Sequence, residues 1–159
     1  LARISPSSGN LQPLKFILSS EVFRNTIIFR HLSWAGYIKD WPGPAEGEKP
    51  TAYIIILGDK DIRPAFGIDA GIAGQSMLLG ATELGLGGCM IGSVDKKGLR
   101  KDLQIPEKYE ILYTIALGKP KEIVVIEDCK ADGSIKYYRD EKGVHHVPKR
   151  TLEDLILIV

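Results

Sequence analysis

The segment from Ile68 to Leu84 constrains the fold more than any other feature, because it leaves almost no polar face. It is rich in Ala, Gly, Ile and Leu, and its apolar positions surround the predicted helix. A helix that is apolar on every side has to be buried. In a chain of 159 residues such burial often needs a second subunit. We therefore expect a central helix at a dimer interface, with Gly71, Gly74 and Gly80 allowing another helix to approach closely.

Length and composition indicate a globular protein. The 159 residues predict one domain, and the hydrophobic and charged fractions of 44% and 26% are ordinary. A net charge of +1 gives no sign of a nucleic-acid or anionic membrane partner. No apolar run approaches the roughly 20 residues that span a bilayer. Cys89 and Cys129 are too few for a disulfide framework, so we expect the protein to be cytoplasmic. Cys89 lies in a Gly-rich apolar stretch, and we expect it to be a buried free thiol.

The remaining elements follow from apolar periodicity and from turn residues. The run Tyr53–Leu57 is short, apolar and β-branched, which predicts a strand buried on both faces. Residues 21–40 are predicted to be helical, and Trp41–Pro44 ends that helix. Further predicted elements are a strand at 14–18, a loop or short strand at 85–92, a short helix at 97–103, strands at 111–117 and 123–126, a charged surface segment at 128–143 and a tail at 151–159 that forms a strand or a docking helix. This irregular interleaving favours an α+β fold.

A polar loop precedes the first predicted strand. The segment Ser5–Pro13 combines small hydroxyls, amides, a glycine and two prolines. Proline removes a backbone donor and fixes φ, and Ser and Asn side chains form local hydrogen bonds that compete with regular structure. Such a stiff polar loop at the end of a strand is a common place to hold a small polar ligand.

Three blocks of the sequence resemble the nitroreductase family of FMN-dependent oxidoreductases. The first is Pro6–Pro13, with the letters PSSGNLQP. The second extends from Asp69 to Gly92 and includes the Gly-rich turn GLGG. The third is Val147–Leu152, with the letters VPKRTL. The resemblance implies an α+β fold with a mixed sheet flanked by helices, in an intertwined homodimer.

The resemblance also implies which residues contact FMN, and it assigns them no acid, base or metal-binding role. The polar loop would bind the flavin or its ribityl chain, the segment after the Gly-rich turn would lie against the isoalloxazine ring, and the basic pair would bind the phosphate. The implied contacts are Ser7, Ser8, Asn10, Gln12, Met90, Ile91, Gly92, Lys149 and Arg150. Arginine binds phosphate through a bidentate fork and lysine acts as a point charge.

The sequence departs from the family pattern in three places. The Arg-Ser-x-Arg element that opens the family is absent, Leu14 stands where an aromatic residue is common, and no lysine maps beside the flavin pyrimidine. We expect residues 1–159 to form a single domain that lacks its natural N-terminal segment, since Leu1–Ile4 resembles the end of a helix.

The implied activity moves a hydride from NADH or NADPH through FMN to a nitroaromatic, a quinone or a similar small acceptor. The cofactor carries the chemistry in such enzymes. The sequence does not distinguish NADH from NADPH. Two alternatives stay open at this point: a flavin-binding carrier or sensor of the same fold, and a metal-dependent hydrolase built on His145 and His146. Adjacent histidines in a charged segment are more typical of a solvated loop.

Overall fold

The computed structural model describes residues 1–130 and 132–158, which divide into two compact units. The large unit contains Leu1–Trp34 and Pro44–Pro120, and the small unit contains Ala35–Gly43 and Lys121–Val159. The single domain predicted from the sequence stays a prediction.

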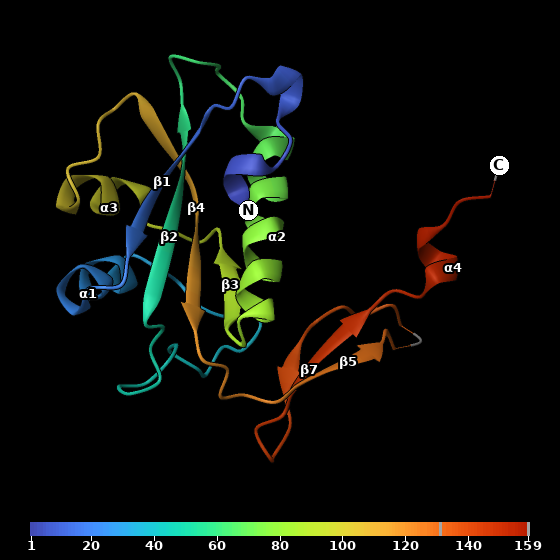
Figure 1. Ribbon diagram of the computed structural model, residues 1–159. Coiled ribbons are helices and arrows are strands. Elements are labelled where there is room, and N and C mark those ends of the chain that lie inside the picture. Colours follow the sequence, from blue (N-terminus) through green and yellow to red (C-terminus); the bar gives the residue numbers. More distant parts are fainter. Residues whose placement is uncertain (131, 159) are drawn as a thin grey trace. The chain divides into compact units, whose positions relative to one another are not determined.

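The large unit is built on a four-stranded antiparallel sheet with the strand order β1-β2-β4-β3. Its strands are β1 Leu14–Ser19, β2 Ala52–Asp59, β3 Gly87–Ile91 and β4 Tyr109–Gly118. Its helices are α1 Val22–Arg30, α2 Gly67–Glu83 and α3 Lys96–Asp102, and it begins with two short 3₁₀ helices, η1 Ala2–Ile4 and η2 Ser8–Asn10. Figure 1 shows α2 on one side of the sheet and α1 with α3 on the other.

Strand β2 lies between β1 and β4 and is buried on both faces, as its β-branched sequence predicts. Ile55 and Leu57 point into a core that α1 and α3 cover through Ile28 and Leu99. Ile56 points to the opposite face, into a second core beneath α2. Successive residues of a strand point to opposite faces, so one apolar strand supplies both cores.

The small unit contains a three-stranded sheet with the strand order β5-β7-β6. Its strands are β5 Val124–Asp128, β6 Tyr138–Arg139 and β7 His145–Lys149, followed by the short helix α4 Leu152–Leu155. Strand β7 pairs parallel with β5 and antiparallel with β6. The Thr151 hydroxyl accepts a hydrogen bond from the Asp154 N–H and caps α4.

The α+β fold class is confirmed, but the helix predicted within 21–40 ends at Arg30. After this residue the chain pairs with a distant segment. Leu32 forms a bridge with Val94, and the Ser33 N–H donates to the Ser93 carbonyl at 2.9 Å. This tertiary pairing overrides the helical periodicity of the sequence.

Within one chain, helix α2 leaves some of its apolar side chains exposed, so its burial at a dimer interface stays a prediction. Ile68 and Leu79 are 72% and 61% exposed. Of its three interior glycines, only Gly71 faces open space, because Gly74 packs against Tyr113 and Gly80 lies against Leu1. The glycines at 74 and 80 therefore serve packing inside the chain.

Two further expectations concern individual residues. Cys89 is exposed, not buried, because it lies on β3, an edge strand with a partner on one side only. His145 and His146 lie on strand β7 and are partly buried, so the expected solvated loop is wrong as well.

Among the described residues, none of the helices is both long enough and apolar enough to cross a membrane.

Candidate functional site

The polar loop Ser5–Pro13 is fixed to the first turn of α2 by a buried carboxylate. Oδ1 of Asp69 accepts hydrogen bonds from the Ser8 N–H and the Ser8 hydroxyl, both at 2.9 Å. Arg63 lies 3.8 Å from the other carboxylate oxygen. The Ser8 N–H is the largest influence that holds the pKa of Asp69 below its usual value of 3.8, although burial acts in the opposite direction. Asp69 is therefore ionised at neutral pH and anchors the loop.

The same loop is also braced internally. The Ser7 hydroxyl accepts a hydrogen bond from the Gln12 N–H at 3.0 Å. The Gln12 side-chain amide donates to the carbonyl and to the side-chain oxygen of Asn10, both at 3.2 Å. Gly9, Asn10 and Gln12 have φ values of 58°, 55° and 52°, a conformation that glycine and asparagine adopt most readily. The loop is thus a rigid structure with exposed amide groups.

A cleft of about 550 Å³ lies between this loop, β1 and α2. Ser7 and Gln12 line its polar side, and Phe16 and Met77 belong to its apolar side. Its full lining is Leu1, Ala2, Arg3, Ser5, Pro6, Ser7, Gln12, Leu14, Lys15, Phe16, Leu18, Asp69, Ala73 and Met77. Two of the nine predicted cofactor contacts therefore face one cleft, together with the anchor Asp69.

The predicted ring-contacting segment Met90–Gly92 lies at the other edge of the sheet. It belongs to the end of β3, whereas the polar loop leads into β1, and β2 and β4 separate these strands. Ile91 is 5% exposed and packs in the core, so only its backbone can reach a ligand. Met90 is 38% exposed, and its Cε would lie 2.9 Å from a Cβ built on Gly74.

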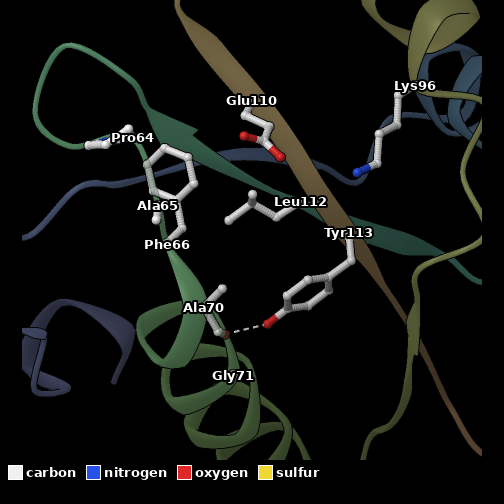
Figure 2. A pocket seen from close by; sticks show the side chains of 10 residues that line it. Pro64, Ala65, Phe66, Ala70, Gly71, Lys96, Glu110, Leu112 and Tyr113 are labelled. Carbon is white, nitrogen blue, oxygen red and sulfur yellow. Dashed lines mark hydrogen bonds between the residues drawn. The ribbon is translucent and has the colours of Figure 1, made fainter.

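A second pocket, of about 380 Å³, lies between the start of α2 and strand β4. Figure 2 shows the side chains of Phe66, Leu112 and Tyr113 around it, with Glu110 and Lys96 along one side. The Tyr113 hydroxyl donates a hydrogen bond to the Ala70 carbonyl, and burial raises the pKa of this tyrosine. The residue is therefore a neutral donor at physiological pH. The nine predicted contacts are not part of this lining.

The predicted phosphate ligands lie in the small unit, on or just after β7. Lys149 is the last residue of β7, Arg150 follows it, and both side chains are exposed. The Lys149 carbonyl accepts a hydrogen bond from the Cys129 N–H at 2.9 Å. The loop and the basic pair thus belong to different units, and their convergence on one cofactor stays a prediction.

The two neighbouring histidines of β7 point to different acids. His145 lies 3.4 Å from Glu122, and its ring packs edge-to-face with Tyr137. His146 lies 3.1 Å from Glu127 and stacks on Tyr138. In the described part of the chain, no three His, Cys, Asp or Glu side chains are placed to hold a metal ion. This arrangement gives no support to the metal-dependent hydrolase.

Asp69 is the site residue that the sequence interpretation missed. Its sequence signal was an acid near the start of a largely apolar helix, and the structure leaves it only 2% exposed. Carboxylates are rarely buried without partners, so such an acid predicts a specific contact. The partner, Ser8, is 61 positions away and could not be identified from the pattern.

Comparison with known proteins relates this chain to one family. The family model described as the nitroreductase family matches residues 37–119. No curated protein matches the chain.

Solved structures give the same relationship. A nitroreductase family protein from Clostridium difficile 630 is 27% identical, with a TM-score of 0.61, over 77% of this chain and 68% of that one. An FMN-dependent nitroreductase from Clostridium difficile R20291 is 26% identical, with a TM-score of 0.60, over 76% and 71% of the two chains. A protein from Desulfovibrio desulfuricans, solved in complex with FMN, shares the fold at 22% identity and a TM-score of 0.69, over 99% and 78%.

Proposed function

The chain belongs to the nitroreductase family, and from this we propose that it is an FMN-dependent oxidoreductase that takes electrons from NADH or NADPH and passes them to a nitroaromatic, a quinone or a similar small acceptor. The family match over residues 37–119 carries the proposal. It is supported by two similar structures, one described as an FMN-dependent nitroreductase and one solved with FMN.

The residues present fit such a cofactor chemically. The polar loop keeps hydrogen-bonding capacity that its internal bonds do not use, including the Asn10 amide N–H groups. Exposed Lys149 and Arg150 supply cations for a phosphate dianion. Gly92 is exposed after β3 and would let the backbone approach a flat ring without a Cβ in between.

Each group has a distinct task in the proposed reaction. Bound FMN would supply the hydride-transfer chemistry. Ser7, Ser8 and Asn10 would orient it through hydrogen bonds, while Lys149 and Arg150 would bind its phosphate. A side-chain nucleophile is not required, and positioning is the main contribution of the protein.

We further propose that two copies of the chain form the site. The loop before β1 and the segment after β3 lie at opposite edges of the four-stranded sheet, so one copy separates these two predicted contact groups. The exposed apolar side chains of α2, including Ile68 and Leu79, offer a surface for a second copy. A homodimer would bring the loop of one copy to the β3 end of its partner.

The direct test is titration of the purified protein with FMN, followed by visible absorption and fluorescence. Saturable binding with a perturbed flavin spectrum is expected. NADH or NADPH oxidation with a quinone or nitroaromatic acceptor then tests turnover. A protein that binds FMN but supports no turnover would be a carrier or sensor, and absence of FMN binding would exclude the proposal.

Arg150 provides a sharper test of the phosphate assignment. Arg150→Ala should weaken FMN binding about ten-fold and riboflavin binding much less, because only FMN carries the phosphate. Lys142→Ala, a change at another exposed cation of the small unit, is the matched control and should alter neither. Equal losses for FMN and riboflavin would remove Arg150 from the phosphate site.

A further inference from the structure

Asp69 has no role in the proposed reaction, yet it is among the most buried charged groups of the large unit. Its side chain is 2% exposed, in the first turn of a largely apolar helix. Burying a carboxylate is costly unless hydrogen bonds or an opposite charge compensate it. Ser8 supplies two hydrogen bonds at 2.9 Å, and Arg63 lies at 3.8 Å. The buried charge of Asp69 is therefore compensated mainly by the polar loop, through Ser8.

The chemistry of this contact fixes the direction of the Ser8 hydrogen bond. An ionised carboxylate only accepts hydrogen bonds, so the single hydroxyl proton of Ser8 has to point at Asp69. Toward any ligand, the Ser8 oxygen can then only accept. The neighbouring Ser7 has the opposite arrangement, because its oxygen accepts from the Gln12 N–H and its proton stays available.

A hydrogen bond inside the loop likewise determines which group of the Asn10 side chain is left for a ligand. Its side-chain oxygen already accepts from the Gln12 amide at 3.2 Å, so its NH₂ group is the part left to donate. The loop thus presents a donor at Ser7, an acceptor at Ser8 and a donor at Asn10. FMN offers complementary groups of both kinds, namely hydroxyl and ring N–H donors and carbonyl acceptors.

We propose that Asp69 is a positioning residue that fixes the loop and sets Ser8 as a hydrogen-bond acceptor toward the cofactor. This inference rests on the proposed binding of FMN. Asp69 itself would not touch the cofactor and would act through Ser8.

A double-mutant cycle on FMN affinity tests the proposal. Ser8→Ala should weaken FMN binding about five-fold, and Asp69→Ala about ten-fold. The double variant should be no weaker than Asp69→Ala alone, because Asp69 acts through Ser8. Asp69→Asn should stay within about three-fold of the wild type, since its amide oxygen can still accept from Ser8.

The matched control is Asp59→Ala. Asp59 is also buried, at 5% exposure, and its carboxylate accepts from the Asp61 N–H without contacting Ser8. Asp59→Ala should reduce the stability of the protein. Any fold-change that it causes in FMN affinity should multiply with the fold-change caused by Ser8→Ala in the double variant. The proposal is overturned if the fold-changes in FMN affinity of Asp69→Ala and Ser8→Ala multiply, or if Asp69→Asn and Asp69→Ala lose the same FMN affinity.

A second measurement needs no cofactor, and it separates the role of Asp69 as loop anchor from the proposed binding of FMN. Hydrogen exchange of residues 5–13 in FMN-free protein should be faster in Asp69→Ala than in the wild type and in Asp69→Asn. Faster exchange in a protein that never binds FMN would keep Asp69 as the loop anchor and exclude the proposed function. Unchanged exchange would exclude the anchor whatever the protein binds.

Discussion

At Gly58 an added methyl group would meet a buried aromatic ring. Gly58 lies on the buried strand β2, and a Cβ there would come within 2.5 Å of three ring carbons of Phe66. Phe66 is itself 5% exposed, so the ring has little room to move. Gly58→Ala should lower the free energy of unfolding by about 1–3 kcal/mol, measured by urea denaturation.

Two variants make this prediction specific. Gly67→Ala is the matched control, because nothing lies within 4 Å of the added Cβ, and its stability should not fall. The double variant Gly58→Ala with Phe66→Leu should lose less than the sum of the single losses, because the smaller side chain relieves the overlap. Additive losses would show that the Phe66 ring is not the cause.

Asp69 also makes the stability of the fold depend on pH. Its pKa in the folded protein is lowered, chiefly by the Ser8 N–H, from the usual 3.8. A carboxyl group whose pKa is lower in the folded protein stabilises the fold at pH values above its unfolded pKa. This contribution is lost as the pH falls through its folded pKa. The wild type should therefore be more stable than Asp69→Asn at pH 7, and the difference should shrink below about pH 3.8. Urea unfolding across this range measures it, and a constant difference would contradict the assignment.

At the scale of elements, α3 depends on one capping residue. Asp95 precedes the helix, and its carboxylate accepts from the Gly98 N–H at 3.0 Å. That hydrogen bond is the main cause that lowers the pKa of Asp95, and His31, at 3.2 Å, adds to the effect. The cap also fixes α3 beside the end of α1, where His31 lies.

Asp95→Ala should therefore lower the free energy of unfolding, as measured by thermal or urea denaturation, because the Gly98 N–H loses its capping acceptor. Asp95→Asn should lose less, because asparagine is an equally good cap but carries no charge. If both variants lose the same amount, the ion pair with His31 and not the cap would account for the stability.

Helix α2 connects the fold to the proposed function. Its inner face packs on the sheet through Ala70, its first turn binds the polar loop through Asp69, and its outer face stays exposed. One helix therefore supports the core, positions the loop and offers a surface for a second copy. A substitution on one of its faces can be designed to leave the others intact.

At the scale of the whole molecule, the proposed dimer makes a prediction for Leu79. This residue of α2 is 61% exposed in the single chain, so Leu79→Lys should cost a monomer little. In a dimer packed on α2, it would bury an unpaired charge and should shift the protein toward monomer in analytical ultracentrifugation. FMN affinity should fall with it, because each site would need both copies.

The control is the same change at a different exposed aliphatic residue. Ile135, 47% exposed in the small unit, can be replaced by lysine without touching α2. Its oligomeric state and FMN affinity should match the wild type. A Leu79→Lys variant that stays dimeric would move the interface away from α2.

The sequence by itself determined the α+β class, the central strand and the irregular polar loop. These features depend on local properties: β-branched side chains favour a buried strand, and proline and glycine exclude regular structure wherever they stand. The letters of the loop and of the Gly-rich turn also indicated the family, which the match over residues 37–119 supports.

Tertiary structure alone decided the rest. Helix α1 ends at Arg30 because the next residues pair with a segment about 60 positions away, and Asp69 holds Ser8 across 61 positions. His145 and His146 lie on a strand because β7 pairs with both β5 and β6. Hydrogen bonds between distant residues form only when the folded chain brings them together, and no local pattern encodes which partner each group will meet.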